Sequence, residues 1–234
     1  MNFKEGEILA FDKPYGWTSF ALVAKARYLI CQKLGVKKLK VGHAGTLDPL
    51  ATGVLILCTG KATKKIEELQ SHTKEYIAHI RLGATTPSFD LEKPIDATYP
   101  TEHITKELVT EVLKKFIGRI EQVPPTFSAC KVNGSRAYDL ARKGEDVQLK
   151  AKTLIIDEIE LTDCQLPDIT IRVVCSKGTY IRALARDIGQ ALNSGAHLTG
   201  LRRTRVGEIK VENCLSIDHF AQWLEQQTIE KSEE

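Results

Sequence analysis

The chain has 234 residues, of which 42% are hydrophobic and 27% are charged, and this composition suits a protein with one sizeable folded core. No apolar run approaches the roughly 18 residues that a membrane-spanning helix needs. Residues 1–6 also lack the pattern of a secretory signal, so we expect a cytoplasmic protein with no membrane partner. The net charge of +3 is too small to establish a nucleic-acid partner.

The first quarter of the chain predicts two strands and a helix. A short strand is expected at Glu7–Phe11, and Thr18 or Ser19 can cap a helix that ends at Gly35. The predicted apolar face of this helix consists of Phe20, Val23, Ala24, Ile30, Cys31 and Leu34. The continuous apolar run Val54–Cys58 predicts a buried central strand.

The rest of the chain mixes strand-like and helical patterns. Strands are expected at residues 75–82, 154–161, 169–175 and 206–211. Helices are expected at residues 105–117, at residues 181–194 and from Ser216 onward. Because these patterns do not alternate regularly, the predicted fold class is α+β rather than a doubly wound sheet.

Basic residues gather in several segments. Lysines flank the Gly42-His43 segment at positions 33, 37, 38, 40, 61, 64 and 65, and arginines occupy positions 202, 203 and 205. If these clusters share a face, they form a phosphate-binding surface, although solvated faces of separate helices explain the charges equally well. Residues 122–144 combine four basic residues with Phe127 and Tyr138. This combination is typical of an RNA-binding segment, but it fits equally well a surface loop whose two aromatic rings pack against the protein.

Asp48 lies in a glycine-rich segment that ends at the buried strand. Pro49 disfavours helical geometry at Asp48, so the carboxylate should lie on a stiff loop at the strand entrance. Active-site residues often occupy such loops, but an Asp-Pro turn is also a common structural device. On the residues alone, the structural interpretation is modestly favoured.

The run Gly42–Leu55, GHAGTLDPLATGVL, closely resembles the catalytic-aspartate motif of the bacterial tRNA pseudouridine synthase B family. Four further segments resemble other motifs of this family and occur in the family's order. They are residues 74–83, residues 122–142, residues 175–182 and residues 195–203. Together the five motifs span most of residues 8–211, which makes the resemblance very specific.

The resemblance implies that uridine 55 in the T-loop of tRNA is isomerised to pseudouridine. Asp48 would be the essential carboxylate, acting at C1′ through either a covalent adduct or a glycal-type intermediate. The reaction needs no cofactor and no metal, and the sequence contains no nucleotide-binding glycine loop, no C-x-x-C pair and no metal-ligand cluster.

The resemblance also implies roles for other residues. Tyr76 would contact the flipped uracil, and Arg182 would keep Asp48 ionised in a pocket that excludes water. The implied substrate-binding residues are His43, Tyr180, Leu201, Lys131 and Arg202. Without the resemblance, Arg182 would be a surface arginine, paired with Asp187 or unpaired, and Tyr76 an interior strand residue.

The implied fold is a central, mainly antiparallel sheet flanked by helices, with a cleft lined by the loops around Asp48 and Arg182. The catalytic domain would span residues 1–212, with an RNA-gripping insertion at about residues 122–150. Residues 213–234 would form a helix and an acidic tail, too few for the PUA-type domain that the family commonly carries. We expect a monomer that binds the T-arm of tRNA, with no protein partner implied.

Three alternatives are weighed against this function. The chain could be a pseudouridine synthase for another RNA, or a non-catalytic RNA-binding or RNA-folding module. The second is disfavoured because Asp48, Tyr76 and Arg182 are all present. A hydrolase is disfavoured because a glycosidase generally needs a second carboxylate, which the segment around Asp48 lacks, and a phosphatase needs metal ligands.

Overall fold

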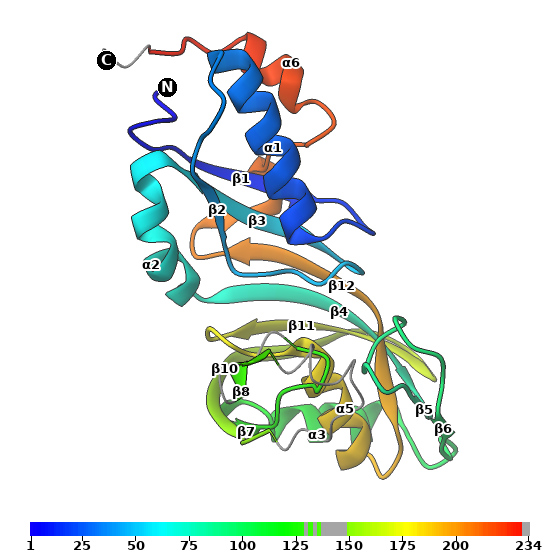
Figure 1. The fold of residues 1–234 in the computed structure, drawn as a ribbon. Helices are drawn as coiled ribbons and strands as arrows, with labels where there is room; N and C mark the ends of the chain where they lie inside the picture. The colour runs from blue at the N-terminus through cyan, green and yellow to red at the C-terminus, as the bar shows by residue number, and fades with distance from the viewer. Residues whose placement is uncertain (129–130, 133–134, 137–148, 231–234) are drawn as a thin grey trace. The chain divides into compact units, whose positions relative to one another are not determined.

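The computed structural model describes residues 1–128, 131–132, 135–136 and 149–230. The chain forms two compact units, Met1–Glu75 with Arg202–Glu234 and Tyr76–Leu201 (Figure 1). Both unit boundaries fall inside strands, namely β4 (Lys74–Leu82) and β12 (Ala196–Val206). The fold is α+β, as predicted, with a sheet flanked by helices.

The first unit is built around β3 (Ala51–Thr59), whose residues 54–58 are fully buried, as the apolar run predicted. Strand β1 (Ile8–Lys13) pairs antiparallel with β3, and so does β2 (Val41–Ala44). Two short helical segments, η1 (Gly60–Lys65) and α2 (Ile66–Ser71), follow β3 along the chain.

Helix α1 (Ser19–Leu34) begins and ends at the predicted residues. The Thr18 hydroxyl accepts a hydrogen bond from the Ala21 amide, and Gly35 closes the helix in the left-handed conformation with φ 65°. The predicted apolar face is partly wrong, because Phe20 is 72% exposed. The neighbouring Ser19 faces inward instead, and at about 100° of rotation per residue Phe20 cannot share that direction.

Leu215, Ile217, Phe220 and Leu224 pack against the core of the first unit. The Leu215 backbone bonds Ala10 and Asp12 of β1, so the chain is still extended at Ser216. For this reason Ser216 does not cap the final helix, and α6 (Phe220–Glu225) begins after His219. The Phe220 ring packs edge-on against Phe11 with centroids 4.9 Å apart.

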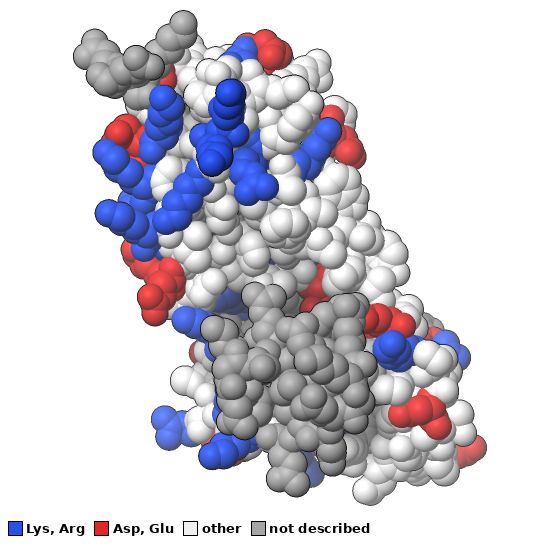
Figure 2. Space-filling view, in the orientation of Figure 1, with Lys and Arg blue, Asp and Glu red and all other residues white. Residues whose placement is uncertain are grey.

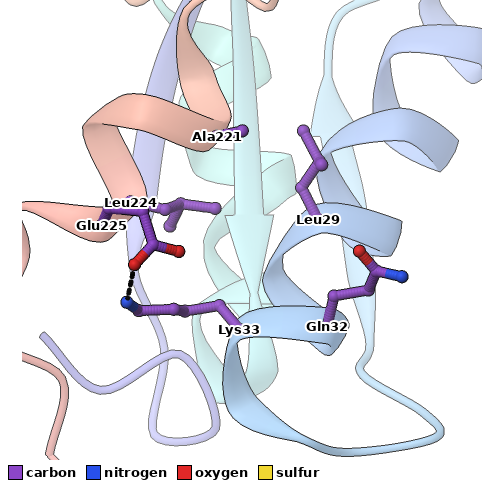
Figure 3. Close-up of a pocket in the computed structure, with 6 residues that line it drawn as sticks. All are labelled: Leu29, Gln32, Lys33, Ala221, Leu224 and Glu225. Carbon is purple, nitrogen blue, oxygen red and sulfur yellow. Dashed lines mark hydrogen bonds and ion pairs between the residues drawn. The ribbon is translucent and has the colours of Figure 1, made fainter.

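A pocket lies between α1 and α6 (Figure 3). Its lining residues are Leu29, Gln32, Lys33, Ala221, Leu224 and Glu225. Lys33 and Glu225 form an ion pair of 2.7 Å at this pocket. The pocket flanks the C-terminal half of α1, roughly 20 Å along the helix from Ser19, so it is separate from the Asp48 loop that Ser19 contacts.

The second unit contains the strand order β4-β11-β10-β7, with β7 at Gly118–Gln122, β10 at Lys152–Gln165 and β11 at Asp168–Cys175. The β10–β11 and β10–β7 pairs are antiparallel. On β4, alternate residues from Tyr76 to Leu82 are buried, as predicted.

Two helices belong to this unit. Helix α3 (Lys106–Lys114) is capped by Thr105, and α5 (Ile181–Ala191) follows Tyr180, both close to their predicted positions. Four short strands complete the unit and form two small ribbons. They are β5 (Ala84–Thr85) with β6 (Ala97–Thr98), and β8 (Lys131–Val132) with β9 (Ser135–Arg136).

The prediction of one strand at residues 206–211 is wrong. Strand β12 ends at Val206, the chain turns through Gly207, and β13 (Ile209–Lys210) pairs back onto β12. Gly207 has φ 55°, which permits a two-residue hairpin turn. Among the described residues, no helix combines the length and the apolarity required to span a bilayer.

Gly53 permits a close approach of two backbones in the first unit. A Cβ atom at this position would lie 2.1 Å from the Arg203 carbonyl oxygen, and φ is +106°. We therefore expect Gly53→Ala to lower the free energy of unfolding by about 3 kcal/mol or more in urea titrations. Gly16→Ala is the matched control, because φ is +80° there but no atom lies within 4 Å. Equal losses in the two variants would contradict the steric explanation.

Candidate active site

Asp48 lies on the loop between β2 and β3 in the first unit. Its carbonyl oxygen accepts a hydrogen bond from the Ala51 amide at 3.0 Å, which closes a tight turn around Pro49. The Pro49 carbonyl accepts a further bond from the Gly16 amide at 2.9 Å. The backbone of this loop is therefore tied both to itself and to the segment that precedes α1.

Ser19 holds the residue next to Asp48. Its buried hydroxyl donates to the Leu47 carbonyl at 3.0 Å and accepts from the Leu47 amide at 2.9 Å. Both polar groups of the Leu47 backbone are thus satisfied by one side chain at the start of α1. The arrangement fixes the peptide that leads into Asp48.

Arg203 bridges the two ends of the Asp48 loop. Its guanidinium is buried and donates from Nε to the Val54 carbonyl at 2.7 Å and from Nη2 to the Gly45 carbonyl at 2.9 Å. Because Gly45 precedes Asp48 and Val54 follows it, one side chain fixes the separation of the two loop ends. Arg203 is therefore a structural residue of the loop, not part of a phosphate-binding surface.

Lys13 is a second buried cation next to this loop. Its ammonium donates to the carbonyls of Pro14 (2.9 Å), Trp17 (2.6 Å) and Pro49 (3.4 Å). Burial lowers the pKa of Lys13 from 10.5 to about 8, the charge of Asp48 opposes this shift, and the charge of Arg203 adds to it. A positive charge is thus held close enough to act electrostatically on the Asp48 carboxylate.

The predicted RNA-binding residues of the first unit have different surroundings. Arg202 makes a bidentate pair with Asp12, at 2.7 and 3.1 Å, and contacts the Thr52 hydroxyl at 3.2 Å. The His43 Nδ1 is buried and has no hydrogen-bond partner among the described residues. Burial, and secondarily the charge of Arg203, lowers the pKa of His43, which favours a neutral imidazole. The RNA contacts of both residues stay predictions.

Arg182 lies in the first turn of α5 in the second unit. It is only 4% exposed and donates to the carbonyls of Ser88 (3.1 Å) and Phe127 (2.8 Å). Its Nε lies 3.9 Å from an Asp90 carboxylate oxygen. The alternative of a surface arginine paired with Asp187 is therefore wrong, and Asp187 pairs with Arg186 instead.

Gln122 fixes the backbone of Tyr180. The Tyr180 amide donates to the Gln122 Oε1 at 2.9 Å, and the Gln122 Nε2 donates back to the Tyr180 carbonyl at 3.2 Å. The Gln122 side chain is buried, and it bonds both backbone polar groups of Tyr180, as a neighbouring β-strand would. This contact sets the position from which α5 and Arg182 begin.

The remaining predicted residues are distributed as follows. Tyr76 is buried on β4, and Leu201 is half-buried on β12. The side chain of Lys131, like most of the predicted insertion, lies outside the described residues. Because Asp48 belongs to the first unit and Arg182 to the second, their meeting at one substrate stays a prediction.

Sequence analysis missed four residues that support the site. They are Lys13, Ser19, Arg203 and Gln122. The sequence contains little signal for them, because a lysine in a turn, a serine at a helix start and an arginine in a basic cluster all have ordinary surface explanations. Among the described residues, no group of three histidine, cysteine, aspartate or glutamate side chains is placed to hold a metal ion.

Comparison with known proteins shows the family to which the chain belongs. Residues 32–181 match the TruB family pseudouridylate synthase (N-terminal domain), and residues 182–233 match the tRNA pseudouridylate synthase B C-terminal domain. The chain belongs to the TruB family of pseudouridylate synthases. The Asp48 loop and the start of β3 both lie inside the first match.

Individual relatives support this assignment. The chain is 79% identical to tRNA pseudouridine synthase B of Phocaeicola vulgatus, over 99% of this chain and 98% of that protein. It is 72% identical to the protein of the same name from Bacteroides fragilis, over the full length of both. The fold resembles the crystal structure of a Cbf5-Nop10-Gar1 complex, with 31% identity and a TM-score of 0.69, over 94% of this chain and 56% of that chain.

We expect Ser19→Ala to misplace the loop of this TruB-family protein. The substitution leaves the Leu47 amide and carbonyl without their partner, which should cost about 1–3 kcal/mol of stability in urea titrations and lower kcat. Ser71→Ala is the control, because Ser71 bonds a carbonyl on the exposed surface of α2 and should change stability by less than about 0.5 kcal/mol. Equal effects of the two substitutions would contradict a loop-specific role.

The electrostatic link between Lys13 and Asp48 can be measured directly. The charge of Asp48 raises the pKa of Lys13, so Asp48→Asn should lower that pKa below its value of about 8 in an NMR titration of the lysine. Glu5→Gln removes an exposed carboxylate of the same unit and should leave the pKa of Lys13 unchanged. An unchanged value in Asp48→Asn would show that the two groups do not interact.

Proposed function

We propose that this enzyme converts uridine 55 in the T-loop of tRNA to pseudouridine, with Asp48 as the essential carboxylate. The family match and the full-length relatives named tRNA pseudouridine synthase B make the chain a pseudouridine synthase, an isomerase that acts on tRNA. The observation that supports Asp48 is the convergence of Ser19, Lys13 and Arg203 on its loop. A flexible surface turn would not need this support.

Asp48 acts at C1′ of the target nucleotide in this proposal. The C1′–N1 bond breaks, the uracil turns while it is held, and a C1′–C5 bond forms. The C5 proton is then lost and N1 gains a proton, so atoms and charge balance without an external reagent. The bonds to Leu47, Gly45 and Val54 would hold the carboxylate in place while the base turns, because catalysis depends on a fixed near-attack geometry.

The second unit supplies the other groups in this proposal. Arg182 provides a cation that favours the ionised carboxylate, and its bonds to the Ser88 and Phe127 carbonyls hold the guanidinium in position. Tyr76, with Tyr180 and Leu201, would contact the extruded uracil. The proposed RNA contacts outside the base are His43, Lys131 and Arg202.

The same proposal covers the organisation of the protein. A catalytic domain at residues 1–212 and a C-terminal helical segment would act together as a monomer on the T-arm. The packing of Phe220 against Phe11 supports treating the C-terminal segment as part of the catalytic core. Because its substrate is tRNA, we place the enzyme in the cytoplasm.

Asp48→Asn tests the proposal. Tritium release from tRNA transcripts labelled at C5 of uridine should fall by roughly a thousandfold or more, because the substitution removes the group that acts at C1′. The native protein should also release no tritium from a transcript in which uridine 55 is replaced by cytidine. Asn preserves the shape of the side chain, so binding of the transcript should persist.

The other outcomes of this experiment are equally informative. Release that survives Asp48→Asn would remove Asp48 from its central role. Release from the cytidine transcript at the native level would assign the activity to another uridine. Binding without any release by the folded native protein would favour an RNA-binding module.

A further inference from the structure

Two arginines one helical turn apart on α5 bond the protein itself instead of facing solvent. Figure 2 shows exposed lysine and arginine side chains gathered on the surface of the first unit. In the second unit, Arg182 is only 4% exposed, and the side chain of Arg186 is 17% exposed. Because residues i and i+4 of a helix lie on the same face, both guanidinium groups leave α5 on one side. The proposed function uses Arg182 but not Arg186.

Both arginines contact the same two segments of the second unit. One segment is the connection between β5 and β6, and we call its residues 86–93 the 86–93 loop. The other segment follows β7, and we call it the 123–128 segment. Arg182 donates to one carbonyl in each of them, at Ser88 and at Phe127. The guanidinium of Arg182 is therefore held between the two segments.

Arg186 repeats this pattern with different atoms. Its guanidinium lies over the ring of Phe89 in the 86–93 loop, with the central carbon 4.9 Å from the ring centroid. Its Nη2 donates to the Val123 carbonyl at 3.0 Å, and its Nε donates to the Asp187 carboxylate at 2.8 Å. A planar guanidinium with N–H groups at fixed angles suits this combination of a ring and two acceptors, whereas an ammonium lacks the plane and the fork.

Phe89 has an uncommon backbone conformation. Its φ is +62°, in the left-handed region that bulky side chains seldom adopt, so the surrounding contacts must hold it there. The Phe89 carbonyl accepts a hydrogen bond from the Leu198 amide at 2.9 Å. Its two neighbours in the chain, Ser88 and Asp90, are both partners of Arg182. A shift of Phe89 would therefore move the groups that hold Arg182 from this side.

The bond to Val123 acts on the other side of Arg182. Two prolines, Pro124 and Pro125, follow Val123, and their fixed φ angles stiffen the connection to Phe127. Lys93 of the 86–93 loop lies over the Phe127 ring, 5.5 Å from its centroid, so the two segments also contact each other. Fixing the Val123 carbonyl therefore restricts where the Phe127 carbonyl can lie.

We infer that Arg186 is a positioning residue for the isomerisation. It fixes the 86–93 loop and the 123–128 segment, and these two segments hold the guanidinium of Arg182 where the proposed function uses its charge. The inference rests on the proposed function for the role of Arg182. The guanidinium of Arg186 is engaged by Phe89, Val123 and Asp187, so it acts through Arg182 and not on the substrate.

The test compares variants of the full-length protein. Arg186→Gln removes the planar cation, and Arg186→Lys keeps the charge without the plane. Arg172→Gln is the matched control, because Arg172 is a half-buried arginine of the same unit that pairs with Glu158 at 2.7 Å on β10 and β11. Arg182→Lys measures the role of Arg182 itself. Single-turnover tritium release gives the rate, anisotropy of labelled tRNA gives Kd, and urea titration confirms that each variant is folded.

Arg186→Gln should lower the single-turnover rate by roughly ten- to a hundredfold, because a small displacement of a catalytic group has an effect of this size. Kd should change by less than about threefold, since Arg186 does not contact the tRNA in this inference. Arg186→Lys should recover little of the rate, because an ammonium does not replace the guanidinium at a stacked site. Arg172→Gln should keep the native rate.

Substitutions of Phe89 test the same contact from the other partner. Phe89→Leu removes the ring under Arg186 and should lower the rate, whereas Phe89→Tyr keeps the ring and should preserve it. Both variants keep a side chain with a Cβ atom at φ +62°, so backbone strain does not distinguish them.

A spectroscopic measurement needs no turnover. In protein labelled with ¹⁵N-arginine, the Nε–H signal of Arg182 is assigned by its loss in Arg182→Lys. This signal should shift in Arg186→Gln and in Phe89→Leu, because the groups around the Arg182 guanidinium move. It should stay in place in Arg172→Gln.

A native rate in Arg186→Gln, or an Arg182 signal that does not move, would overturn the inference. So would an equal loss of rate in Arg172→Gln, or a loss explained by the unfolded fraction alone. A lowered rate in Arg182→Lys beside a native rate in Arg186→Gln would overturn this inference and leave the proposed function intact. A native rate in Arg182→Lys would instead remove Arg182 from the proposed function, and this inference with it.

Discussion

The candidate site depends on a buried arginine that binds neutral carbonyls at both ends of the Asp48 loop. Burying a guanidinium is costly unless its N–H groups form hydrogen bonds, and the Arg203 Nε and Nη2 bond the Val54 and Gly45 carbonyls. The backbone of Arg203 also lies so close to Gly53 that only glycine fits at that position. Breaking the guanidinium bonds would remove the one side chain among the described residues that links the two ends of the loop that carries Asp48.

Electrostatics and mechanical support are combined in this part of the first unit. Lys13 and Arg203 are both buried cations, and the charge of Asp48 favours the ammonium of Lys13 although burial and Arg203 disfavour it. The attraction is mutual, so Lys13 supplies a positive charge to the Asp48 carboxylate from within the first unit. Lys13 also donates to the Pro49 carbonyl, so the same group supports the loop.

The second unit repeats this use of side chains as backbone supports. Gln122 pairs with both polar groups of the Tyr180 backbone, and Arg182 donates to the Ser88 and Phe127 carbonyls. These bonds join the start of α5 to segments more than fifty residues away in the chain. Membership of the TruB family explains why such separate motifs occur together in one sequence.

The sequence by itself determined the local elements and the family of this protein. These features depend only on residues that are neighbours in the sequence. They are the buried run of β3, the Thr18 and Gly35 caps of α1, the alternation on β4 and the motif around Asp48. Only the tertiary structure decided which polar side chains are buried. From the neighbouring sequence alone, one would expect Lys13, Arg203 and Gln122 to be exposed polar residues. They are buried because distant parts of the chain supply the carbonyls and amides that they bond. Distant contacts also explain the two wrong predictions for helices. Ser19 of α1 bonds Leu47, so Ser19 faces inward and Phe20 is exposed. Leu215 pairs with β1, so α6 begins after Ser216.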